Sequence, residues 1–456
     1  MKKKKDVSQY DKMTQTPIPK LILAMSVPSI ISMLITNIYN LVDTAFVGQL
    51  GTSASGAVGV VFGFMAIIQA FGYLFGQGAG SVLSRALGEK DKEKASIYSS
   101  VGFFSSFIFG VIITAVGFIF LDDVVMFLGS TPTIAPYAKT YITYILIAAP
   151  FMSSSLTMDN MLRYEGKSSY GMIGLMVGAV LNMIGDPIFM FAFDMGIAGA
   201  GLSTALSQIV SWIILMAMFL SGKTETKIRF RLFAKITPKI MLNIFTTGFP
   251  SLLRQALNSI STVMLNSQCS GYGDAAVAAM SIVSRIVFFA VSVALGIGQG
   301  FQPIAAFNYG AKKFARMKRS FIFTILAAEG VIIVMCLLLL IFAPQLIALF
   351  RNDPDVIDIG TRALRLQAGA TFVLPVIMVT EMLLQATGRR VTSSLLSSLR
   401  NGLIFIPVLL ILESLRGIDG IQESQPLSML ITLPVAILFM ILFFRRVPKE
   451  DVPENQ

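Results

Sequence analysis

Residues 320–343 read SFIFTILAAEGVIIVMCLLLLIFA, a run of mostly apolar side chains with one charged residue, Glu329. An α-helix rises 1.5 Å per residue, so about 20 apolar residues cross the roughly 30 Å of hydrocarbon in a bilayer. The stretch is long enough to cross, and its apolar residues do not alternate with polar ones as they would in a barrel strand. It therefore predicts a membrane-spanning helix.

Stretches of the same kind fill the chain. The 456 residues are 55% hydrophobic and 13% charged, with a mean hydropathy of +0.75, which excludes an ordinary water-soluble globule. We count about twelve stretches, and they predict an all-α membrane protein of twelve transmembrane helices. The stretches cover residues 18–47, 55–84, 96–120, 135–158, 168–193, 197–221, 240–265, 275–306, 320–343, 356–385, 394–413 and 427–445.

The basic start Met1–Lys5 is like that of a signal peptide, but no small-residue cleavage pattern follows, so we interpret the first stretch as a retained span. Lysine and arginine then fall mainly in alternate loops. Because cytoplasmic loops collect these residues, the pattern predicts a multi-pass protein of the bacterial inner membrane with both termini in the cytoplasm. The net charge of +11 thus reflects topology and contact with lipid head groups, and no nucleic-acid partner is expected.

An internal repeat divides the chain. Pro28-Ser29 recurs as Pro250-Ser251, and Gly76-Gln77-Gly78 recurs as Gly298-Gln299-Gly300, both after 222 residues. The repeat predicts two pseudo-symmetric six-helix bundles, residues 1–222 and 240–456, joined by a cytoplasmic basic linker, residues 223–239. With six helices in each half, both halves have the same orientation, and a substrate site is expected between them near mid-depth.

Two carboxylates in predicted spans have no counterpart in the second half. Asp43 falls opposite Leu265, and Asp186 falls opposite Ile406, so the common scaffold does not need them. A carboxylate in the membrane costs a few kcal/mol and usually faces a cavity or an ion path. Two interpretations of each stay open: Asp43 lies at a helix end in water or in an ion site, and Asp186 has a structural or an ionic role.

Polar neighbours favour an ion site. Asn182 and Asp186 are one helical turn apart, and hard oxygen ligands suit sodium or a proton relay. Pro187 lacks an N–H, which leaves a backbone carbonyl of the preceding turn free to accept a cation or water. Three residues share a helical face with Asp43 and are candidates for a substrate cavity, as is a tyrosine of the fourth stretch: Thr36, Tyr39, Asn40 and Tyr141.

Other chemistry is less favoured. There is no histidine, and Cys269 and Cys336 do not have the spacing of a metal or redox site, so we expect packing roles for both and no cofactor. A membrane-embedded enzyme would need a nucleophile and base or a metal site, which the sequence does not present. No metal is expected beyond sodium at the coupling site.

Several motifs resemble the multidrug and toxic compound extrusion (MATE) family over nearly the whole chain, in particular its bacterial DinF and MepA-like branch. They are Asn40-Leu-Val-Asp43-Thr44, Arg85-Ala-Leu-Gly88, Leu181-Asn182 with Asp186-Pro187, and Gly298-Gln-Gly-Phe-Gln-Pro303 followed by Asn308-Tyr309-Gly310-Ala311-Lys312. The resemblance implies antiport of organic molecules against a proton or sodium gradient. It also implies that the coupling ion binds at Asp43, Asn182, Asp186 and Thr204.

The resemblance leaves open which of Asp43 and Asp186 is the main coupling residue. We expect a monomer that binds small organic, often cationic, molecules within the lipid bilayer and supports xenobiotic efflux and antibiotic resistance. A flippase for lipid-linked precursors is the alternative function. It would need a cavity rich in basic residues for a pyrophosphate head group, and intramembrane arginines are few.

Overall fold

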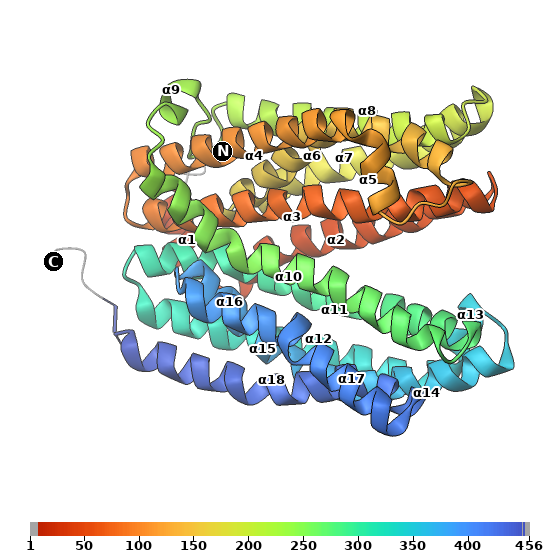
Figure 1. Cartoon of the computed structure of the whole chain (residues 1–456). Coiled ribbons are helices and arrows are strands. Elements are labelled where there is room, and N and C mark those ends of the chain that lie inside the picture. Colours follow the sequence, from red (N-terminus) through yellow and green to blue (C-terminus); the bar gives the residue numbers. More distant parts are fainter. Residues whose placement is uncertain (1–7, 449, 452–456) are drawn as a thin grey trace, which may run out of the picture. The chain divides into compact units, whose positions relative to one another are not determined.

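The computed structural model describes residues 8–448 and 450–451, so the basic stretch Met1–Lys5 lies outside the described residues. Apart from short loops and turns, the described residues are helical (Figure 1). The longest helices are α3 (Thr52–Gly88) and α11 (Asp274–Gly310). These helices follow from the apolar runs, because a helix satisfies its backbone hydrogen bonds internally. The chain is an all-α membrane protein.

The remaining elements follow in chain order. Those of the first part of the chain are α1 (Gln9–Gln15), α2 (Ile18–Gly48), α4 (Lys92–Ile119), α5 (Leu121–Phe127), α6 (Ala135–Tyr164), α7 (Ser168–Pro187), the π-helix η1 (Ile188–Ala192), α8 (Ile197–Leu220) and α9 (Phe230–Phe233). Those of the second part are α10 (Pro238–Ser270), α12 (Phe314–Ile341), α13 (Ala343–Phe350), α14 (Pro354–Thr371), α15 (Leu374–Ala386), α16 (Arg390–Ser398), the π-helix η2 (Leu399–Leu403), α17 (Phe405–Arg416) and α18 (Ile418–Arg446).

Each of the predicted stretches coincides with a helix or with consecutive helices. Within the described residues, 10 helices are long and apolar enough to cross a membrane, and 11 are if α14 and α15, which meet at a 53° bend, form one broken span. The stretch 240–265 forms the long helix α10 but is too polar to pass the same test. Its polar residues include Arg254, Gln255 and Asn258, which explains the shortfall against twelve.

The structure forms two compact units, and helices α2 and α10 are each shared between them. Unit 1 contains the chain up to Met13 and Ile31–Leu252, and unit 2 contains Thr14–Ile30 and the chain from Leu253 onward. The units therefore divide inside helices, whereas the halves predicted from the repeat, 1–222 and 240–456, divide in the linker. The division into halves 1–222 and 240–456 therefore remains a prediction from the sequence repeat.

The repeated Gly-Gln-Gly tripeptide lies where the shared helices pack. In unit 1, a Cβ on Gly78 would come within 2.2 Å of the carbonyl oxygen of Ile244 on α10. In unit 2, a Cβ on Gly300 would come within 2.6 Å of the backbone nitrogen of Ser26 on α2. Only a residue without a side chain permits such an approach of two helices. The repeat thus encodes the same close helix crossing in both units.

Each unit has an apolar core. In unit 1, it includes Val47, Val61 and Ile142, and in unit 2, it includes Ala279, Val283 and Leu409. Leu265, the repeat partner of Asp43, is 2% exposed and belongs to the core of unit 2. The position that holds an acid in one unit therefore holds a packing residue in the other.

The basic linker is attached to unit 1 by a buried acid. Glu165 follows the last residue of α6 and is fully buried. Its carboxylate accepts hydrogen bonds from the backbone nitrogens of Glu225 (2.9 Å) and Thr226 (3.1 Å) and from the Thr226 hydroxyl. Ser96 and Ser100 of α4 accept hydrogen bonds from the next backbone nitrogens along the linker. Burial raises the pKa of Glu165 to about 7, against the effect of these hydrogen bonds.

Candidate functional site

Helices α7 and α8 bring together the polar residues of the predicted ion site. The Asn182 amide nitrogen donates to Asp186 Oδ1 at 3.1 Å and also lies 3.2 Å from Thr204 Oγ1 and 3.3 Å from Ser203 Oγ. The Ser203 hydroxyl donates to the Asn182 carbonyl at 3.2 Å. Gly185 allows this contact, because a Cβ there would meet Ser203 Oγ at 2.5 Å. Asp186 is fully buried.

Asp43 of α2 completes the site. It is 3% exposed, so the interpretation that it lies at a helix end in water does not hold in the structure. Its carboxyl group lies within electrostatic range of that of Asp186. Two ionised carboxylates repel each other, and neither can donate a hydrogen bond to the other. Binding of a proton, or of a cation in its place, relieves this repulsion.

Three oxygen atoms in this cluster have no donor among the described residues. They are Asp43 Oδ1, Asp186 Oδ2 and Asn182 Oδ1, all shielded from solvent. Buried polar atoms are normally satisfied, so each unpaired acceptor requires an explanation. Carboxylate and amide oxygens are ligands that sodium accepts, and they also accept protons or water. The donor set fits a hard monovalent cation or a proton and lacks the sulfur and imidazole that softer metals prefer.

Of the four predicted cavity residues, two are near the acids. Tyr141 of α6 is buried, and both it and Tyr39 of α2 lie within electrostatic range of the two acids. Thr36 instead donates to the carbonyl of Ser32 on its own helix at 2.8 Å. Asn40 is half-buried, and its side chain makes no hydrogen bond within the described part of the chain.

Sequence reasoning missed Ser203. The residue precedes Thr204 on α8 and was hidden by its small size and by the many serines of the chain. One signal was available: Gly185 next to Asp186 marks a place where another helix comes close, and that helix must present a small side chain. Ser203 is such a side chain.

The helix changes form immediately after Asp186. Helix α7 ends at Pro187, and the next five residues form the π-helix η1. Proline removes one backbone hydrogen bond, and single π-turns inside helices occur mostly at functional sites. The main chain beside the acid pair is therefore wider and less regular than an α-helix.

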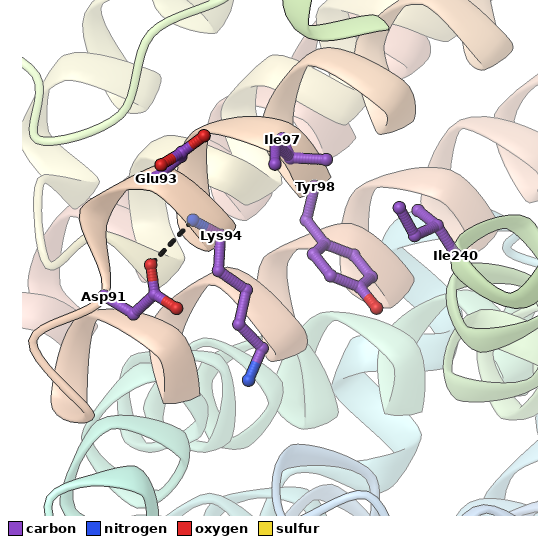
Figure 2. A pocket seen from close by; sticks show the side chains of 6 residues that line it. All are labelled: Asp91, Glu93, Lys94, Ile97, Tyr98 and Ile240. Atoms are coloured by element: carbon purple, nitrogen blue, oxygen red, sulfur yellow. Dashed lines mark hydrogen bonds between the residues drawn. The ribbon is translucent and has the colours of Figure 1, made fainter. Parts of the chain in front are cut away.

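A surface pocket lies elsewhere on unit 1 and shares no residue with the acid site. Figure 2 shows its lining, where the Asp91 carboxylate accepts from the Lys94 backbone nitrogen at 2.9 Å and caps α4. The lining residues are Asp91, Glu93, Lys94, Ile97, Tyr98 and Ile240. These contacts are those of a helix start, and we assign the pocket no ligand.

A family model described as MatE matches the chain twice, over residues 28–188 and 250–411. The chain belongs to the MATE family. The two matches begin 222 residues apart, which is the spacing of the repeated motifs. The resemblance of the motifs to this family is thereby confirmed, and the chain is a transporter rather than an enzyme.

Curated relatives and solved structures of the MATE family cover the chain almost completely. The multidrug export protein MepA of Staphylococcus saprophyticus is 29% identical over 93% of both chains, and that of Staphylococcus aureus is 29% identical over 94% of both. An outward-facing structure of a multidrug resistance MATE transporter of the MOP superfamily is 25% identical, with a TM-score of 0.90 over 98% of this chain and 100% of that one. A MATE crystal structure in complex with MaL6 has a TM-score of 0.89 at 25% identity and covers 97% of this chain and 98% of that one. The chain belongs to the MepA-like branch.

Proposed function

We propose that this MATE-family protein exports lipophilic, mostly cationic organic molecules in exchange for protons or sodium ions, by alternating access. The export of many drugs is the activity named for its MepA relatives. The observation that supports ion coupling is the buried pair of Asp43 and Asp186. Asp43 Oδ1 and Asp186 Oδ2 have no hydrogen-bond donor among the described residues. Such a pair changes its net charge when it gains or loses one monovalent cation.

The cation works through differential binding. A coupling ion can drive transport only if it binds the outward and inward states with different affinity, and the substrate must do the same. In the proposed cycle, the bound ion neutralises negative charge on the acid pair and thereby favours the state that releases substrate. Loss of the ion restores negative charge, which attracts a cationic substrate from the cytoplasm. The π-helix η1 next to Asp186 is the element that we expect to respond.

The four predicted residues form one ion site in this proposal. Asp186 and Asp43 supply charge, Asn182 supplies an amide oxygen, and Thr204 supplies a hydroxyl. The site needs no cofactor. The protein is proposed to act as a monomer in the bacterial cytoplasmic membrane, with both termini in the cytoplasm.

The test is uptake of a fluorescent cationic dye into proteoliposomes under separately imposed proton and sodium gradients. We expect uptake under one of the two gradients and its collapse when the matching ionophore is added. Uptake that is independent of both gradients would contradict antiport. Export of lipid-linked precursors, with no dye transport under either gradient, would favour the flippase function instead.

A further inference from the structure

Unit 2 contains a cluster of one buried acid and two half-buried arginines, with a net charge opposite in sign to that of the acid site. Arg254 of α10 pairs with Glu381 of α15, with Nη1 and Oε1 2.9 Å apart. The Glu381 side chain is fully buried and the Arg254 side chain is 16% exposed. Arg400 of η2 lies within electrostatic range of both. One acid therefore faces two arginines, and the cluster has a net charge of +1.

The second arginine, Arg400, has no direct partner among the described residues. Arg400 makes no hydrogen bond and no ion pair with any described residue, and its Nε is shielded from solvent. Glu381, which interacts with Arg400 electrostatically, is already bonded to Arg254 through one oxygen. An unpaired guanidinium inside a membrane protein is costly, and such residues usually mark a substrate or ion path.

The repeat shows that the scaffold does not need these arginines. Glu381 aligns with Asp159 at the 222-residue spacing, so both units have an acid at this position. Arg254 aligns with Ser32, and Arg400 falls opposite Gly178 or Val180, since the register slips by two residues before Pro187. The arginines are present in one unit only, as the acids Asp43 and Asp186 are in the other.

The geometry suits a carboxylate. Arg254 and Arg400 come from different elements and face a common acid, and guanidinium groups bind carboxylates through paired N–H donors. Arg400 belongs to the π-helix η2, a widened turn of the kind found at functional sites. We propose that Arg400, together with Arg254, binds a carboxylate group carried by the transported molecule, while Glu381 competes with that group for Arg254.

The proposal rests on the proposed transport of organic molecules and assigns to Arg400 and Arg254 the recognition of those substrates that carry a carboxylate. Unit 1 supplies acids that attract cations, and unit 2 supplies the arginine site for the anionic group. The two sites are in separate units, so their contributions to binding can be measured separately.

The experiment compares a rhodamine free acid with its methyl ester, which differ only in the carboxylate. Binding of both dyes to the purified full-length protein is measured by fluorescence polarisation. We expect Arg400→Gln to weaken binding of the free acid about tenfold, or about 1.4 kcal/mol, and that of the ester less than twofold. Arg400→Lys should restore part of the loss. An equal loss for both dyes, or no loss for the free acid, would overturn the proposal.

Two further variants keep the test decisive. Arg285→Gln removes an exposed arginine of α11 and should leave both affinities unchanged. If Arg400→Gln does not fold, Glu381→Gln takes its place. Removal of the competing glutamate should increase the affinity for the free-acid dye relative to that for the ester dye. An unchanged ratio of the two affinities would overturn the proposal. Failure of the wild type to bind the ester dye would contradict the proposed cation transport. The arginine site is tested separately, by how the variants change the affinity for the free-acid dye.

Discussion

At the scale of single residues, Asp186 has the most constrained surroundings of the acid site. It is fully buried and bonded to Asn182, and it lies against Asp43. We expect Asp186→Asn to reduce gradient-driven dye export by about tenfold or more, because an amide cannot change charge when a cation binds. Dye binding should persist. Transport and binding are measured separately at matched expression in the membrane.

The repeat supplies matched controls for that experiment. Leu265→Ala and Ile406→Ala alter the positions that align with Asp43 and Asp186, and they should leave coupling to the gradient intact. Asp43→Asn should also impair export. The loss of export relative to that of Asp186→Asn measures how much each acid contributes to ion binding. Full export by Asp186→Asn would remove the proposed coupling mechanism and direct attention to Asp43 alone.

Glu165 provides a pH-dependent prediction outside the membrane spans. Burial raises its pKa from 4.5 to about 7, so the folded protein holds a proton that the unfolded chain releases between these values. Its contribution to stability is fully present below pH 4.5 and is lost as the pH rises through about 7, with an upper limit of roughly 3 kcal/mol. The thermal midpoint of the wild type relative to Glu165→Gln should fall over this range. A pH-independent difference would contradict the assignment.

The sequence predicted the residues of the acid site better than those of its surroundings. Asp43, Asn182 and Asp186 were singled out because buried acids and their helical neighbours are rare in membrane spans, whereas Thr204 was implied by the resemblance to the MATE family. Helical spacing alone also selected Thr36, whose hydroxyl donates to the Ser32 carbonyl of its own helix, and Asn40, whose side chain makes no hydrogen bond with any described residue. Spacing defines a face of one helix, but rotation against the next helix depends on packing, which one sequence does not specify.

At the scale of helices, the glycines of the α3 and α10 crossing determine how closely the two helices approach. A Cβ on Gly248 would come within 1.9 Å of the carbonyl oxygen of Leu74. Gly248→Ala should therefore destabilise unit 1 by about 1–3 kcal/mol, as overpacking does elsewhere. Thermal unfolding in detergent, followed by loss of monodisperse protein, measures the effect.

An exposed glycine of α3, the other helix of this crossing, provides the control. Gly59 has no atom within 4 Å of an added Cβ, so Gly59→Ala should be neutral or stabilising by up to about 1 kcal/mol. Equal destabilisation by both variants would show that the crossing is not tightly packed. The repeat predicted the glycine pairs but not their contacts, because each glycine packs on a helix far away in the sequence.

At the scale of the whole molecule, the arrangement of lysine and arginine predicts that both termini and the linker are cytoplasmic. Lys227 in the linker and Arg351 in a predicted outer loop are exposed. After replacement of Cys269 and Cys336, a cysteine substituted for Arg351 should react with an impermeant maleimide in whole cells. One substituted for Lys227 should react only after the membrane is opened. Strong labelling at Lys227 in intact cells would reverse the topology.

The shared helices impose an order on biosynthesis. Ser26 of α2 donates to the carbonyl of Ile297, 271 residues later in the chain, so this contact forms only after Ile297 has been synthesised. Unit 1 in turn is not complete until the ribosome has passed Leu252. A nascent chain released after the linker would thus carry an orphaned start of α2 and an open groove along α3. Such truncated chains should be substrates for membrane quality-control proteases, and separately expressed halves should accumulate only when made together.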